Sequence, residues 1–172
     1  MEIHALPAFG DDGSLRVVVE SPRGATAKFK YDAESGVFTL SRALPIGLAY
    51  PYDWGFVPGT HGPDGDPLDA MILWDCTGYP GVVIPCRPIG ILRVDQVSRV
   101  SHGRERNDRI LAVPIKAPRW DDVRDVHQIP GRILKELEQF FIAAVAFEGK
   151  DLRVLDWAGR DEALASVRAA IA

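Results

Sequence analysis

The chain has 172 residues, of which 47% are hydrophobic and 26% charged, and its formal net charge is −4. This length and composition fit one globular domain with a sizeable core, so residues 1–172 are expected to form a single domain. The acidic balance argues against a general nucleic-acid binder. Neither a basic leader nor an apolar run of about 18 residues is visible, which predicts no signal peptide, no membrane span and a cytoplasmic location.

The N-terminal part predicts three strands. LRVVVE at 15–20 reads as the first, and it ends at Glu20 before a turn signal. A second strand at 26–32 places Lys28 and Lys30 on one face, because strand side chains alternate. A hairpin turn leads into VFTLSR, which ends at Arg42. These cations either line a solvated strand face or belong to a site.

The motif DGDPLD in the middle of the chain carries Asp64, Asp66 and Asp69. Its Gly and Pro predict a bend that gathers the three carboxylates. Two such charges about 5 Å apart repel by roughly 3 kcal/mol at an effective dielectric near 20. A hard divalent cation such as Mg²⁺ or Mn²⁺ would offset that repulsion. The alternative is a solvated turn, although the apolar run MILW at 71–74 predicts a buried strand that would hold the cluster rigidly.

Two further apolar strands are predicted at 82–94 and 109–115. The polar segment between them, Asp95 to Asp108, carries several arginines and is either a disordered tip or a lid over an anionic ligand. Pro130 opens a helix whose apolar residues recur at three-and-four spacing through 145, and a short helix follows at 161–171. Strands followed by helices predict an α+β domain, with a small closed barrel flanked by helices.

These segments together resemble a known family. DGDPLD is preceded by YPYDWGF and followed by CRPIGIL, with Glu20, Lys28, Arg42 and Tyr50 at matching spacing. The pattern is similar to that of the soluble inorganic pyrophosphatases of the single-domain, Mg²⁺-dependent class. The resemblance implies a five-stranded OB-like closed β-barrel flanked by C-terminal helices. It also implies hydrolysis of diphosphate by a metal-activated water, and a cytoplasmic homo-oligomer, commonly a hexamer in bacterial members.

The resemblance assigns roles to individual residues. Asp64, Asp69 and Glu20 look like metal ligands, and Asp66 resembles a metal-facing carboxylate that also accepts the proton of the attacking water. The expected substrate-binding residues are Lys28, Arg42, Tyr50 and Arg109. The residue types suit this chemistry independently, because the reaction needs a charged clamp on a tetra-anion, an activated water and a proton acceptor.

The sequence departs from the family pattern at five site positions. Lys30 stands where the family has Glu, Trp54 replaces a phosphate-contacting Tyr, and Asn107 replaces a metal-binding Asp. Ala144 and Val145 fall where a Tyr and Lys pair is expected. The hypothesis that follows is a divergent pyrophosphatase with fewer bound metals, in which Lys30 and arginines of the 95–108 loop partly replace the lost cations and contacts.

Three other functions compete with this one. The chain could hydrolyse another phosphoric anhydride, such as a nucleotide or organic diphosphate, because the lost contacts are those that would exclude a larger group. It could also be a non-catalytic phosphate-binding homologue. An OB-type oligonucleotide binder is disfavoured by the acidic charge and the lack of an aromatic ladder on a basic face.

Overall fold

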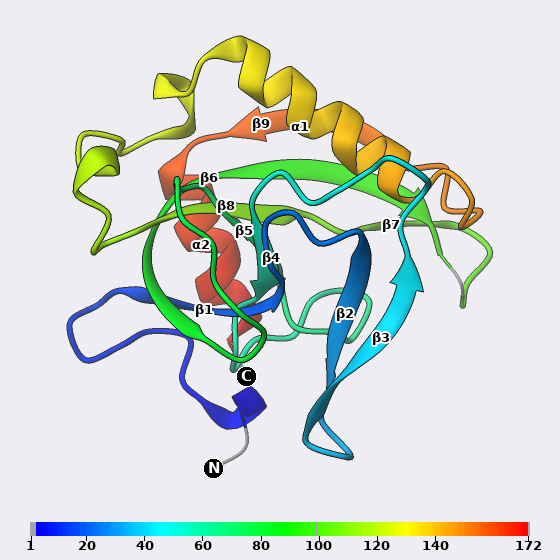
Figure 1. Ribbon diagram of the computed structural model, residues 1–172, viewed down its shortest axis with the longest axis horizontal. Helices are drawn as coiled ribbons and strands as arrows, with labels where there is room; N and C mark the ends of the chain where they lie inside the picture. The colour runs from blue at the N-terminus through cyan, green and yellow to red at the C-terminus, as the bar shows by residue number, and fades with distance from the viewer. Residues whose placement is uncertain (1–2, 99, 172) are drawn as a thin grey trace.

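The computed structural model describes residues 3–98 and 100–171 (Figure 1). Five strands close into a ring in which β6 returns to β1, and only the β5–β8 pair is parallel within it. This ring confirms the predicted OB-like closed barrel. In ring order the strands are β1 (Leu15–Ser21), β4 (Asp53–Phe56), β5 (Asp69–Ile72), β8 (Arg109–Pro114) and β6 (Val83–Val97).

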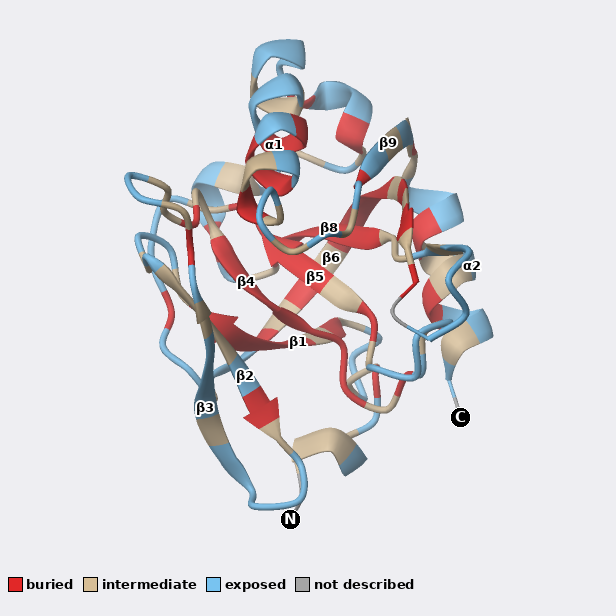
Figure 2. Cartoon of the chain, turned by 90° about the vertical axis from the view of Figure 1, so that its right-hand side faces the viewer, coloured by how far each residue is buried: buried red, intermediate tan, exposed pale blue. Residues whose placement is uncertain are grey.

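The remaining elements surround this ring. Strands β7 (Arg104–Arg106) and β9 (Arg153–Ala158) pair with β6, whereas β2 (Ala27–Asp32) and β3 (Val37–Ala43) form a separate hairpin. The α-helices are α1 (Gly131–Ala144) and α2 (Arg160–Ala170), and they cover different sides of the barrel (Figure 2). Short 3₁₀ turns are η1 (Ile3–Ala5), η2 (Pro118–Trp120) and η3 (Val126–Gln128). None of the helices in residues 3–98 and 100–171 is long and apolar enough to cross a membrane.

Strand alternation divides the core into two clusters. On β8, Leu111 and Val113 belong to the cluster that packs against α1, whereas Ile110 and Ala112 belong to the cluster that packs against α2. The predicted apolar stripe of α1 supplies Leu137, Phe140, Phe141 and Ala144 to the first cluster. Both faces of β8 are therefore buried, and its first residue, Arg109, is held at a fixed place on the barrel rim.

Two glycines permit the close contacts that the barrel needs. A Cβ on Gly55 would lie 1.8 Å from the carbonyl oxygen of Val18, in the pairing of β4 with β1. A Cβ on Gly90 would lie 2.5 Å from the Cβ of Val126, where the register of β6 shifts against β8. Any larger residue would force backbone apart at these positions, because both contacts are shorter than van der Waals distance.

The structure changes three expectations about elements. Strand β6 continues to Val97 and pairs with β7, so residues 95–97 and 104–106 form an antiparallel pair of strands instead of belonging to a disordered tip. Strands β4 and β9 were not predicted, because DWGF and RVLDWA lack a clear apolar alternation. The strand predicted at 71–74 begins earlier, at Asp69.

Candidate active site

The acidic motif forms the predicted bend. Gly65 has φ +85°, and its N–H donates to the carbonyl oxygen of Gly62 at 3.0 Å. The N–H of Gly62 donates in turn to the carbonyl of Asp66 at 2.7 Å, and Asp64 accepts the N–H of Asp66 at 3.1 Å. The bend ends where β5 starts at Asp69. The carboxylates therefore lie at the edge of a rigid strand, as the sequence indicated.

Four predicted metal ligands line one hollow, which we call the carboxylate cavity and define by Glu20, Lys30, Asp64, Asp66 and Asp69. Glu20 projects from β1 and is only 5% exposed, and its Oε1 accepts the N–H of Tyr31 at 2.8 Å. Burial, reinforced by the charge of Asp69, raises the pKa of Glu20 from 4.5 to about 7. Burial and the neighbouring carboxylates likewise raise the pKa of Asp64. Negative charge is thus crowded in this cavity.

The ammonium group of Lys30 lies among these carboxylates. Its Nζ lies 2.7 Å from Oδ2 of Asp66. Burial opposes the charge of Lys30, but the bond to Asp66 and the charges of Glu20 and Asp69 leave its pKa raised. The cation therefore already neutralises part of the cluster, which supports the expectation that Lys30 replaces a lost cation.

The adjoining hollow, which we call the cationic cavity, is defined by Arg42, Tyr50, Trp54, Arg109 and Phe141. Arg109 is 6% exposed, and its guanidinium carbon lies 5.4 Å from the ring centre of Phe141. Its Nε and Nη1 are buried and have no hydrogen-bond partner among the residues that the structure describes. Burial lowers the pKa of Arg109, although the charge of Asp69 acts to raise it. A buried guanidinium with two unused donors favours an anionic ligand.

Strand register explains why the two cavities adjoin. Asp69 opposes Arg109 in the parallel β5–β8 pair, and Lys28 opposes Arg42 in the β2–β3 hairpin. Lys28, Asp69 and Asn107 line both cavities. The carboxylates and the cationic side chains therefore lie along one cleft. This cleft contains all the predicted site residues.

Arg42 also makes contacts with the end of α1 that the sequence did not predict. Its Nη2 donates to the carbonyl oxygen of Ala144 at 2.8 Å, and its Nε lies 3.4 Å from a carboxylate oxygen of Glu148. Carbonyls at a helix C-terminus lack intrahelical partners, so a cation there is favourable. Arg42 thus attaches the end of α1 to the cationic cavity. Tyr50 lies beside it, 5% exposed, and burial raises the pKa of its hydroxyl.

The positions that depart from the family pattern also line the cleft. Trp54, Ala144 and Val145 belong to the wall of the cationic cavity, and Asn107 reaches both cavities. The indole Nε1 of Trp54 is buried, and no residue within 3–98 and 100–171 forms a hydrogen bond with it. The wall is consequently more apolar where Ala144 and Val145 stand, and it keeps one unused donor on Trp54.

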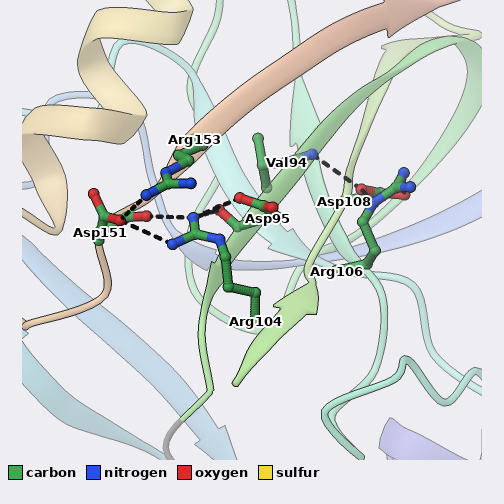
Figure 3. Close-up of polar contacts among 7 residues, drawn as sticks. All are labelled: Val94, Asp95, Arg104, Arg106, Asp108, Asp151 and Arg153. Carbon is green, nitrogen blue, oxygen red and sulfur yellow. Dashed lines mark hydrogen bonds and ion pairs between the residues drawn. The ribbon is translucent and has the colours of Figure 1, made fainter. Parts of the chain in front are cut away.

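Arg104 and Arg106 of the 95–108 segment do not replace lost contacts, so this expectation was wrong for these two arginines. Arg104 bonds Asp95 and Asp151, and Arg106 bonds Asp108 (Figure 3). Paired carboxylates already neutralise these guanidinium groups, so neither group is placed to bind a phosphate directly. Arg99, which belongs to the same segment, lies outside the described residues.

One functional candidate was missed. Lys150, in the connection between α1 and β9, lines both the carboxylate and the cationic cavities. No sequence signal marks it, because it lies far from the acidic motif and in no regular element. Only the packing of this connection against β6 brings Lys150 into the cleft.

The donors present fit a hard divalent cation in chemistry but are not assembled as ligands. The carboxylate cavity offers oxygen atoms only, which suit Mg²⁺ or Mn²⁺, and its crowded charge would be offset by a cation. As the side chains lie, no three His, Cys, Asp or Glu residues within 3–98 and 100–171 form a group that could hold a metal ion. A cation would therefore have to draw the carboxylates together, in competition with Lys30 for Asp66.

A small closed barrel whose cleft joins crowded carboxylates to a buried arginine is typical of a class of protein that binds a polyanion. The family model described as inorganic pyrophosphatase matches residues 17–172. The inorganic pyrophosphatase of Synechocystis sp. is 37% identical over 95% of this chain and 94% of its own. That of Streptomyces coelicolor is 38% identical over 88% and 90%. The chain belongs to the inorganic pyrophosphatase family.

Solved structures agree in fold. The crystal structure of the inorganic pyrophosphatase from Thermus thermophilus superposes with a TM-score of 0.89 and 32% identity, over 99% of this chain and 97% of that one. The enzyme from Helicobacter pylori gives a TM-score of 0.88 and 30% identity, over 97% and 96%. The barrel and its flanking helices are thus those of the family, and the predicted resemblance is confirmed.

Proposed function

We propose that this protein hydrolyses inorganic diphosphate to two phosphate ions, with Mg²⁺ as its cation and Mn²⁺ as a substitute. The observation that carries the proposal is Arg109, which is buried in the cationic cavity beside a cavity of carboxylates and has two nitrogens without a hydrogen-bond partner in the described part of the chain. A site for a bare cation would not need such a donor. A site for a simple anion would not need the carboxylates.

The residues of the two cavities have different roles in this proposal. Arg109 and Lys28 bind phosphate oxygens and stabilise the charge that grows on the departing phosphate. Arg42 and Tyr50 form the wall that fixes its position. Asp64, Asp69, Asp66 and Glu20 would hold the cation, which supplies a bound water of lowered pKa when present.

Asp66 accepts the proton of the attacking water. The water oxygen forms a bond to one phosphorus, the bridging P–O bond breaks, and its electron pair stays on the leaving phosphate. Lys30 holds Oδ2 of Asp66, so Oδ1 is the oxygen left to face the water. The roles of these residues are proposals that rest on their places in the cleft and on the family resemblance.

The test is a phosphate-release assay with diphosphate and either Mg²⁺ or Mn²⁺. Wild-type protein should release phosphate, and Asp66→Asn should lower kcat by at least about 100-fold, the usual contribution of a general base. Asp75→Asn is the matched control, because Asp75 is also an aspartate paired with a single cation, Arg119, and lies outside both cavities. No release by the wild type with either metal would overturn the proposal.

A second substrate class is favoured by one observation. Trp54, Ala144 and Val145 give the cationic cavity an aromatic and apolar wall. Such a wall could accept the organic group of a nucleotide or other organic diphosphate. The same assay over a panel of diphosphates separates the two, because inorganic diphosphate should give the highest kcat/KM if the first proposal holds.

Assembly and location are also part of the proposal. A cytoplasmic homo-oligomer, with six copies as the family resemblance implies, stays a prediction. Sedimentation of the purified protein would decide the number of copies. A molecule that sediments as a monomer at micromolar concentration would contradict the expected assembly.

A further inference from the structure

Lys150 lies at a junction in the cleft. It lines the carboxylate cavity, the cationic cavity and a third, open cleft whose wall includes Gln96, Ser98 and Glu105. A diphosphate that reaches from a cation among the carboxylates to Arg109 must pass the place where the first two cavities meet. An ammonium at that place suits a phosphate oxygen.

The backbone around Lys150 is held in an unusual conformation. Asp151 has φ +42° although it is not a glycine, and Gly149 before it has φ +66°. The carbonyl oxygen of Lys150 accepts the N–H of Val97 at 2.7 Å. A non-glycine residue at positive φ costs about 1–3 kcal/mol, so the surrounding contacts must fix this bend.

Arg104 supplies two of those contacts, both to Asp151. It donates to the Asp151 carboxylate at 2.8 Å, to the Asp151 carbonyl at 2.7 Å and to the Asp95 carboxylate at 2.5 Å (Figure 3). Arg153 donates to the same Asp151 carboxylate at 3.0 Å. The hairpin of β6 and β7 is thus bonded directly to the segment that carries Lys150.

The residues at the end of α1 that line the cleft carry no charge, so Lys150 supplies a charge that they do not. Ala144 and Val145 reach the cationic cavity from that helix without any charge. Lys150, in the connection after α1, brings a positive charge into the cleft instead. We propose that Lys150 is a further substrate-binding residue that contacts the diphosphate where the two cavities meet, and that Arg104 is a positioning residue acting on it through Asp151. The inference rests on the proposed function above.

The first experiment compares Lys150→Met with Lys150→Arg. Lys150→Met should raise KM for diphosphate by about 10-fold, the usual effect of losing one charge-assisted hydrogen bond, with a smaller change in kcat. Lys150→Arg should stay within about threefold of wild type, because it keeps the charge. A KM of Lys150→Met within twofold of wild type, in a variant with unchanged thermal stability, would overturn the assignment.

The second experiment tests the positioning role. Arg104→Gln should raise KM by about threefold to tenfold, whereas Arg106→Gln on the same hairpin should not, because Arg106 bonds Asp108 and not Asp151. In a Lys150→Met background the Arg104 change should have no further effect on KM, since both act on one contact. Equal effects of the two arginine variants, or full additivity with Lys150→Met, would refute the positioning role.

Direct binding separates this inference from the proposed function. Calorimetry with methylenediphosphonate, which cannot be hydrolysed at its bridge, should show binding to the wild type and about 10-fold weaker binding to Lys150→Met. If wild type binds it but does not hydrolyse diphosphate, the activity fails and the assignment of Lys150 is still decided by this titration. If wild type neither binds nor hydrolyses, both proposals fail.

Discussion

Replacing Glu20 by Gln should remove a pH dependence of stability that is expected of the wild-type protein without metal. In the folded protein the pKa of Glu20 is raised from 4.5 to about 7, chiefly by burial and further by Asp69. The folded state therefore holds a proton that the unfolded chain releases above pH 4.5. By linkage, the contribution of Glu20 is fully present below that pH and is lost as pH rises through about 7.

The size of the effect follows from the shift. A rise from 4.5 to about 7, at about 1.4 kcal/mol per pKa unit, corresponds to about 3 kcal/mol lost between those values. Glutamine keeps the oxygen that accepts the N–H of Tyr31 and carries no charge. Glu20→Gln should therefore match wild type near pH 4.5 and exceed its free energy of unfolding by up to about 3 kcal/mol at pH 8.

Urea unfolding followed by tryptophan fluorescence, at pH 4.5 to 8 in a chelator, measures this difference. Glu34→Gln is the control, because Glu34 lies exposed in the turn between β2 and β3 and should not change the pH profile. The reasoning is refuted if Glu20→Gln is no more stable than wild type at pH 8. Adding Mg²⁺ at pH 8 should stabilise wild type more than the variant, since a cation offsets the buried charge.

Three further outcomes are expected. Arg109→Met should raise KM for diphosphate by about 100-fold without lowering the urea stability of the free protein, and lower stability with unchanged KM would contradict its role. Lys30→Met should strengthen Mn²⁺ binding by about threefold to fivefold in an electron paramagnetic resonance titration, because an exposed ion pair is worth up to about 1 kcal/mol, and equal binding would contradict competition for Asp66. Asp53→Asn should cost about 2–4 kcal/mol in urea unfolding, because Asp53 is fully buried and accepts the N–H groups of Arg23, Trp74 and Gly78. Unchanged stability of that variant would show that an amide satisfies those donors.

Local patterns in the sequence were enough for much of the fold and half of the site. The Gly and Pro of the acidic motif predicted its bend, and the apolar stripe predicted α1 and its buried face. Alternation in the first three strands placed Lys28, Lys30 and Arg42 correctly on one hairpin. These features depend on residues close in the chain, so their physics can be read without the tertiary structure.

Contacts between distant segments could not be read in this way. The sequence left the segment that carries Arg104 and Arg106 as either a disordered tip or a lid over an anionic ligand, yet these arginines bond Asp151 and Asp108 once β6 pairs with β7. Lys150 enters the cleft only because the connection after α1 packs against β6.

The amino-acid order alone determined which charges this protein has available and how each local segment bends. Tertiary structure decided which of those charges keep donors without a partner among the described residues, as Arg109 does, and which are neutralised, as Lys30 is by Asp66. The reason is that strand register and ion pairing depend on separations along the chain that no local periodicity encodes.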